Sequence, residues 1–157
     1  MYKRQAQLVG AVRDTLGWES WKAEMTPESL GGLGDWFEGQ VEMRKKDPGE
    51  LRETREKLSF PIDIPGEELT NRTFSLAIDI GMYFSQVVLK NLPGTRWEHP
   101  LGDKKFVDYG QPVIVGFGTV SLNPVRVMVT TAYRIAGGEH AELRKLYSCL
   151  LYTSRCV

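Results

Sequence analysis

The segment from Glu67 to Leu92 constrains the fold more than any other part of the chain. Its apolar residues recur at the three- and four-residue spacing of an amphipathic helix, which gathers them on one broad face. That face holds Leu69, Leu76, Ala77, Ile80, Tyr83, Phe84, Val87 and Val88. The opposite side carries a second apolar stripe of Ile78, Met82 and Leu89. Because a helix with two apolar sides needs packing partners on both, we predict a central helix over residues 67–92 between two layers.

Asp79 lies on the polar flank between these stripes and is the candidate buried charge of the chain. A carboxylate buried without a hydrogen-bond donor is costly, so burial of Asp79 requires a cation beside it. We expect Arg96 or Arg126 to be that cation. The alternative is that the flank faces water, and Asp79 then needs no partner.

The N-terminal segment, residues 1–58, carries three helix signals. Apolar residues at helical spacing predict a first helix from Met1 to Leu16. A cap residue followed by proline marks two further helix starts, at Thr26-Pro27 and Asp47-Pro48. The last of these segments is nearly all charge, so we predict a solvated surface helix, with a partner-binding charged face as the alternative. Residues 60–65 alternate apolar and polar between prolines, which favours an extended link or an edge strand.

The segment after the central helix alternates strand patterns with turn residues. We predict strands at Thr95–Glu98, Lys104–Val107 and Val113–Phe117, and the last, β-branched and free of charge, is expected at the centre of the sheet. Asn123 as N-cap and Pro124 after it open a closing helix. The predicted fold class is α+β: a long central helix packed between N-terminal helices and a small, mostly antiparallel sheet, with a closing C-terminal helix.

The chain is expected to form a single domain over residues 1–148, made of a helical N-terminal segment (residues 1–58) and a helix–sheet–helix segment (residues 67–148). Its 157 residues are enough for one domain that buries roughly two thirds of its unfolded surface. Residues 149–157 differ from the rest and resemble the translated adapter sequence that ends many metagenomic reading frames. We expect this tail to be non-native and leave it out of the functional argument.

Charge and hydropathy disfavour two classes of partner. Basic and acidic residues balance at 20 each, so no global field draws the chain to nucleic acid. Nucleic-acid binding would need Lys3, Arg4 and Arg13 to meet further bases on one face, and it is the least favoured option. No apolar run reaches about 18 residues and no signal peptide is visible, so we expect no membrane partner and a cytoplasmic protein.

Groups that carry chemistry are few. His99 and His140 stand in no metal-ligand spacing, and neither a serine nor a cysteine is paired with a base. Cys149 and Cys156 lack the CxxC spacing of a metal or redox site. Gly116-Phe117-Gly118 lacks the third glycine of a dinucleotide fingerprint. We therefore expect no catalytic residue, no cofactor and no metal.

Polar and aromatic residues between the predicted strands and at the start of the closing helix form the candidate binding surface. They could meet at one end of the sheet, where loops on a rigid scaffold commonly bind partners. The candidate residues are Trp97, Glu98, Asp108, Tyr109, Gln111 and Asn123. Turn chemistry alone is an alternative explanation for Asp108, Gly110 and Asn123.

A resemblance to a known family lies between Leu76 and Tyr147. Its motifs are Gly94-Thr95-Arg96-Trp97 after the central helix, then Asp108-Tyr109-Gly110-Gln111-Pro112 and Leu122-Asn123-Pro124. In this order they resemble a family of short uncharacterised actinobacterial proteins with a domain of unknown function, and more distantly small α+β domains of bacterial immunity and accessory proteins. The resemblance implies a bacterial α+β domain without an assigned reaction. Relatives often carry Tyr-Leu-Gly-Glu where this chain has Tyr83-Phe84-Ser85-Gln86, so the acid that a catalytic role would use is missing.

Two functions are compatible with these features. The first is a non-catalytic module that binds another protein, of immunity or accessory type. The second is a small-molecule-binding protein or an enzyme with a pocket at the sheet end near Trp97, Tyr109 and Asn123. A deep pocket with a desolvated Asp79 or Glu98 beside a histidine would favour the second, and a flat apolar or charged patch would favour the first.

Overall fold

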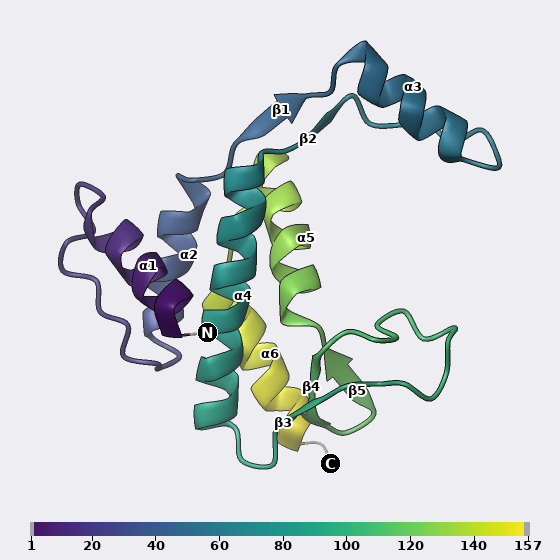
Figure 1. The fold of residues 1–157 in the computed structure, drawn as a ribbon. Coiled ribbons are helices and arrows are strands. Elements are labelled where there is room, and N and C mark those ends of the chain that lie inside the picture. The colour runs from purple at the N-terminus through teal and green to yellow at the C-terminus, as the bar shows by residue number, and fades with distance from the viewer. Residues whose placement is uncertain (1, 156–157) are drawn as a thin grey trace.

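The computed structural model describes the main chain of residues 2–155 and the side chains of residues 3–153. Within that range the chain forms six helices and five short strands (Figure 1). In chain order they are α1 (Tyr2–Arg13), α2 (Ser29–Glu38), β1 (Met43–Lys45), α3 (Pro48–Lys57), β2 (Glu67–Leu69), α4 (Asn71–Asn91), β3 (Arg96–Glu98), β4 (Val113–Phe117), β5 (Val120–Leu122), α5 (Pro124–Ala136) and α6 (Leu143–Arg155). The strands form two antiparallel sheets, so the predicted α+β class is confirmed.

Helix α4 is the long central helix, as predicted, but it begins at Asn71 rather than at Glu67. Thr70 is its N-cap: this residue is extended, and its hydroxyl accepts a hydrogen bond from the main-chain N–H of Thr73. The residues just before the cap form strand β2 and pair with β1. The prediction that Glu67 and Glu68 open the helix is therefore wrong, because the threonine cap starts the helix later and these two residues are needed in a sheet.

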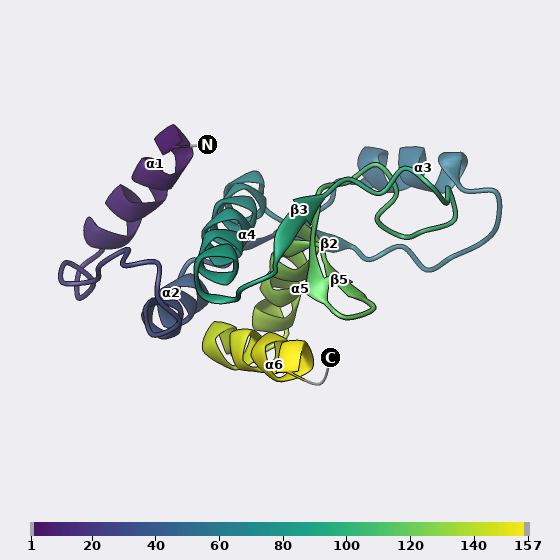
Figure 2. The ribbon, with the colours of Figure 1, turned by 90° about the horizontal axis from the view of Figure 1, so that it is seen from below.

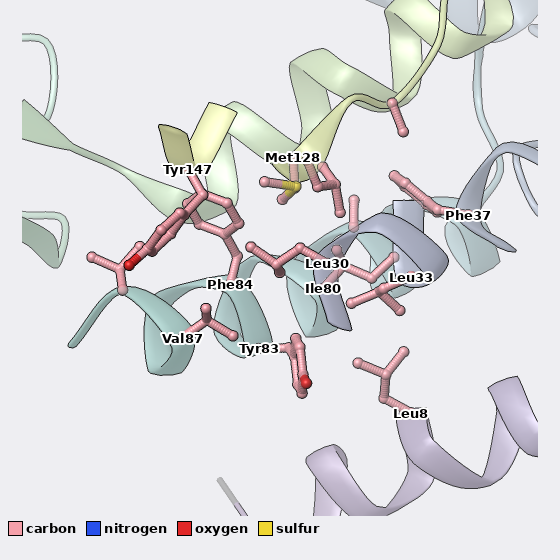
Figure 3. Packing of buried hydrophobic residues seen from close by; sticks show 14 of the residues in the cluster. Leu8, Leu30, Leu33, Phe37, Ile80, Tyr83, Phe84, Val87, Met128 and Tyr147 are labelled. Atoms are coloured by element: carbon pink, nitrogen blue, oxygen red, sulfur yellow. The ribbon is translucent and has the colours of Figure 1, made fainter. Parts of the chain in front are cut away.

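Helix α4 has α5 as its principal neighbour and α1 on another side. The helices α4 and α5 come closest at Gly81, where a Cβ atom would lie 2.8 Å from the Pro124 carbonyl oxygen. Figure 3 shows Ile80 of α4 near Leu30 of α2 and Met128 of α5, all within one buried cluster. The three-stranded sheet lies beside the C-terminal end of α4 (Figure 1) and contributes to the same core. Helix α5 therefore provides more of the cover of α4 than the sheet does.

The second apolar stripe of α4 is only partly covered. Leu89 packs at the edge of the core, whereas Ile78 and Met82 stay partly exposed. Phe74, one turn before Ile78, is exposed. Figure 2 shows α2 and α6 on one side of α4, and α1 with the β3–β4 connection on the other. Packing partners thus cover the broad face fully, while α1 covers only the flank of the second stripe.

The three-stranded sheet has the order β3-β4-β5, so Val113–Phe117 is its central strand, as predicted. Gly116 has a φ of +113°, and a Cβ atom there would lie 2.5 Å from the Gly94 carbonyl oxygen, so only glycine fits this close approach. The strand predicted at Lys104–Val107 does not form. These exposed residues make turns instead, and the Asp103 carboxylate accepts a hydrogen bond from the main-chain N–H of Lys105 at 2.8 Å.

The other helices agree with the sequence in outline and differ at their ends. Helix α1 ends at Arg13, before the predicted end at Leu16, and α3 begins at Pro48, as predicted. Helix α6 continues through the last stretch of the chain to Arg155, and Leu150 belongs to the buried core. That the tail is non-native stays a prediction, and Met1, Cys156 and Val157 lie outside the described residues.

Candidate functional site

Residues 43–69 form an arm that projects from the rest of the molecule (Figure 1). Strands β1 and β2 make a two-stranded antiparallel ribbon in which Arg44 lies opposite Glu68. Helix α3 and the segment after it are carried at the far end of this ribbon (Figure 1). The main-chain N–H of Thr70 donates to the Glu42 carbonyl oxygen at 3.0 Å, so the two ends of the arm leave the body side by side.

Ion pairs and a capping box fix the start of α3 on the ribbon. The Asp47 carboxylate accepts from the Glu50 main-chain N–H at 2.9 Å, and the Glu50 carboxylate accepts from the Asp47 main-chain N–H at 2.8 Å. Arg44 of β1 donates to Glu50 at 2.7 Å and also pairs with Glu68. The Arg44 hydrogen bond is the first cause that holds the pKa of Glu50 below its ordinary value, and the Asp47 main-chain N–H is the second. These contacts orient α3, although exposed ion pairs add little stability.

Helix α3 has ten residues, and none of their side chains is buried. An isolated helix shorter than about 12–15 residues is marginal in water, and most helices in proteins are stabilised by packing an apolar face. Helix α3 fully buries no such face within the described residues, so it depends largely on its cap and its ion pairs. A helix in this situation gains stability when another molecule covers it.

The tip of the arm, residues 58–65, follows α3 and exposes apolar side chains. Phe60 is 63% exposed and Ile62 is 50% exposed. The main chain bends at Ser59 and Phe60, and Pro61 and Pro65 limit the conformations of the residues that follow. Apolar side chains held outside the body on a restricted segment are typical of a contact surface.

A second projection is the β3–β4 loop, residues 99–112, which also exposes apolar side chains. Val107 is 68% exposed and Leu101 is 60% exposed. Phe106 and Tyr109 are exposed to a smaller extent. In Figure 1 the arm and the β3–β4 loop are separated along the axis of α4, and in Figure 2, seen along that axis from below, the loop lies in front of α3. Both projections therefore lie on the same side of the molecule.

A polar cluster, made of the buried Asp108 and Asn123 and the exposed Gln111 and Arg126, anchors the β3–β4 loop to the start of α5. The Asp108 side chain is 2% exposed. Its two oxygens accept from Asn123 Nδ2 at 2.9 Å and from Arg126 Nη2 at 2.9 Å. Asn123 is at the same time the N-cap of α5, because its Oδ1 accepts from the Arg126 main-chain N–H at 3.0 Å. The Gln111 Oε1 accepts from Asn123 Nδ2 at 2.7 Å and completes the Asp108 cluster.

The structure thus brings together three of the six residues of the candidate binding surface, namely Asp108, Gln111 and Asn123. Tyr109 lies beside them on the exposed loop. Trp97 packs against the core from β3 and, with Glu98, His99 and Pro112, borders a hollow on the surface. Asn123 is buried and its amide is engaged in the Asp108 cluster, so it does not share that hollow. Arg126 is not among the predicted residues of the binding surface. The N-cap motif that begins at Asn123 locates its main-chain N–H, but no local pattern indicates that its side chain binds Asp108.

Asp79 is largely buried, with 13% of its side chain exposed, and its cation is Arg4. The Arg4 Nε atom donates to Asp79 Oδ1 at 2.7 Å, and the Gln5 Nε2 atom donates to the Asp79 carbonyl oxygen at 3.2 Å. The expectation that Arg96 or Arg126 would pair with Asp79 is wrong. Helix α1 packs along this flank of α4 and brings its own arginine there, while Arg126 is engaged with Asp108.

Two side chains of types that can act in catalysis, Tyr83 and His140, make contacts between elements of the fold. The buried Tyr83 hydroxyl accepts from the Met25 main-chain N–H and shares a hydrogen bond of 2.7 Å with Ser29, and burial raises the pKa of Tyr83. His140 is exposed, and its Nδ1 lies 3.2 Å from the Glu38 carboxylate. Among the described residues no three His, Cys, Asp or Glu side chains gather in a way that could hold a metal ion. No helix in the described range is both long and apolar enough to cross a membrane.

Comparisons of the chain with protein-family models, with curated protein sequences and with solved structures find no significant match. The resemblance to the actinobacterial family therefore stays a prediction.

Proposed function

We propose that the chain is a non-catalytic bacterial protein-interaction module, of immunity or accessory type, that acts in the cytoplasm by binding another protein. The observation that carries this proposal is the pair of projections on one side of the molecule, each with exposed apolar side chains. Each projection exposes apolar side chains on a protruding segment, which suits contact with a protein surface better than a small molecule, because a small molecule needs a concave pocket. The balanced charge of the chain supports a protein partner over nucleic acid.

The design of the two projections supports the same proposal. In each projection, polar residues fix the segment to its support, and different, apolar residues are exposed to solvent. The Asp108 cluster holds the β3–β4 loop while Val107 faces outward, and the Arg44 ion pairs hold α3 while Phe60 faces outward. The β3–β4 loop is preorganised in this way and loses little conformational entropy when it binds.

The test is a comparison of proteins captured from an extract of the host by the immobilised full chain. The double variant Phe60→Asp/Val107→Asp places a charge on each projection, and we expect it to reduce capture of the partner at least about tenfold, as loss of a central apolar contact does. Leu16→Asp is the matched control, because Leu16 is 92% exposed and lies in neither projection. Equal capture by all three proteins would refute the proposal. An extract that yields no partner, together with turnover of a metabolite, would favour the pocket near Trp97 and Tyr109 instead.

A further inference from the structure

A groove runs between α1 and α4 and is lined by Arg4, Gln5, Ile78, Asp79 and Met82. Two of these residues, Ile78 and Met82, belong to the partly covered second stripe of α4. The groove has a volume of about 240 Å³, which is below the roughly 300–1,000 Å³ of pockets that bind drug-sized ligands. Its size and its apolar lining fit one large apolar side chain better than a metabolite or a cofactor.

Gln5 is the second feature of this groove. Its Nε2 atom donates to the Asp79 carbonyl oxygen, which fixes the orientation of the amide. Its Oε1 atom is buried and has no hydrogen-bond donor among the described residues. A buried acceptor without a donor is unfavourable. Because this oxygen is covered, the Gln5 amide has to rotate before a donor from an occupant of the groove can reach it.

The tip of the arm has the properties that the groove requires of its occupant. Phe60 is a large apolar side chain in water. Ile62, two residues later, is also exposed, so the tip offers a second apolar side chain close to Phe60. Pro61 and Pro65 limit the main-chain freedom of the tip before it binds, which reduces the entropy lost on docking.

Charge complements this fit. Asp63 follows Ile62 in the tip and is exposed, while Lys3 is exposed on α1 next to Arg4, which lines the groove and is paired with Asp79. A docked tip would therefore bring an acidic residue close to the exposed Lys3. The ribbon itself is less suited to pair with a second ribbon through β1, because Arg44 and Lys45 would then lie opposite like charges.

The tip cannot fill the groove of its own chain. In Figure 1 the tip lies at the far end of the arm, and α1 lies on the opposite flank of α4. Figure 2 shows that α1 and α3 nevertheless project to the same side of α4. Two copies that face each other through this side can exchange tips around a two-fold axis, and such an assembly closes at two chains.

We propose that the tip of the arm docks into the α1–α4 groove of a second copy of this chain, with Phe60 as the inserted side chain, and that two copies exchange tips reciprocally. This inference rests on the proposed function of the arm as a contact surface, and it names the arm's partner. The β3–β4 loop stays available for a different protein.

The test is the oligomeric state of the purified full chain, measured by sedimentation velocity over a range of concentrations. We expect a dimer for the wild type and for the control Leu16→Asp. Phe60→Asp in the tip and Met82→Lys in the groove should each weaken dimerisation at least about tenfold. An equimolar mixture of these two variants should recover association, because one intact tip then meets one intact groove.

A wild type that stays monomeric at every concentration would overturn the inference, and so would a dimer that Phe60→Asp leaves unchanged. Circular dichroism checks that Met82→Lys is folded. If that variant does not fold, the comparison of Phe60→Asp with Leu16→Asp decides alone. Failure here is distinct from failure of the proposed function. A monomer whose projections still capture a host protein refutes only the exchange of tips, whereas a dimer that captures no host protein leaves that exchange standing.

Discussion

At the scale of single residues, the Asp108 cluster shows how one asparagine can serve two purposes. Asn123 caps α5 through its Oδ1 atom, and its Nδ2 atom donates a hydrogen bond to a buried oxygen of Asp108. Each of its side-chain atoms is therefore committed to structure. Asn123, which the sequence places on the predicted binding surface, instead anchors the β3–β4 loop.

Replacing Asn123 with alanine should destabilise the chain by about 2–3 kcal/mol, because an N-cap is lost and Asp108 is left with an unpaired buried oxygen. Urea unfolding followed by circular dichroism measures this change. Gln111→Ala is the control, because this exposed residue only accepts one bond from Asn123, and it should change stability by less than about 1 kcal/mol. Equal stability of Asn123→Ala and wild type would mean that the cluster does not hold the loop.

The pair His140–Glu38 links the segment before α6 to α2 and should respond to pH. The Glu38 side chain raises the pKa of His140 above its ordinary value of 6.5. The Ala141 main-chain N–H first, and His140 after it, lower the pKa of Glu38 below 4.5. The stabilisation from charged His140 is thus complete below pH 6.5 and is lost as the pH rises through its folded pKa. That from Glu38 is present above pH 4.5 and is lost as the pH falls through its folded pKa.

Substitution Glu38→Gln should lower the pKa of His140, because the carboxylate that favours the imidazolium is gone. An NMR titration of the His140 ring protons measures this directly. Glu42→Gln is the matched control, because Glu42 pairs with Arg72 at 3.6 Å and does not contact His140. An unchanged His140 titration in Glu38→Gln would show that the contact between the two side chains does not persist in solution.

Local signals are what sequence reveals at this scale. The cap at Asn123 is visible because its partner is three residues away. The partners of Asp79 and Asp108 are not, because Arg4 lies 75 residues from Asp79 and Arg126 lies 18 residues from Asp108. Such pairs depend on how helices pack, and the nearest cation in the sequence is a poor guide to them.

At the scale of elements, the contact between α4 and α5 depends on the absence of a side chain at Gly81. A Cβ atom there would meet the Pro124 main chain, which cannot rotate away as a side chain could. The helices are held at this distance because Pro124 begins α5 directly after its cap.

Gly81→Ala should therefore destabilise the chain by about 1–3 kcal/mol, because the two helices must separate. Gly10→Ala is the matched control: Gly10 also lies in a helix, and a Cβ atom there meets nothing within 4 Å. The control should stabilise the chain by roughly 0.5–1 kcal/mol through helix propensity. Thermal unfolding of both variants provides the comparison. Stabilisation by both substitutions would contradict the close approach of α4 and α5.

Long, periodic elements are predictable here and short paired ones are not. The presence of α4 as the longest helix, the central place of β4 and the start of α5 all follow from patterns within the element itself. Strands β1 and β2 have three residues each and are mostly charged, so no pattern marks them. They exist because they pair with each other across the arm, and the helical spacing of Leu69 conceals β2.

At the scale of the whole molecule, the body and the arm should differ in local stability. Helix α4 lies in the core, whereas α3 has no buried side chain. Hydrogen exchange of the monomer should therefore be much faster for the amides of α3 than for those in the middle of α4, because α3 can open without disturbing the core. Mass spectrometry of deuterium uptake at low protein concentration measures the difference. Equal protection of the two helices would mean that the arm is packed against the body.

The same experiment at high concentration bears on the exchange of tips. Contacts made with a second copy should slow exchange in the tip and in α1, while uptake by the β3–β4 loop stays unchanged. The charge pattern of residues 48–58 predicts an exposed helix, but it does not predict that the arm projects, because the projection depends on the direction of the β1–β2 ribbon.

The hydrogen bond between Thr70 and Glu42, which joins the two ends of the arm, bears on how the chain can evolve. Since the strands of the ribbon enter and leave the body at neighbouring points, the intervening stretch is topologically an insertion. A tight turn joining those two points would restore an uninterrupted body, and a different insert could occupy the same place. Exchange of the segment between these two points by recombination would change what the protein recognises and leave the sequence of the body unchanged.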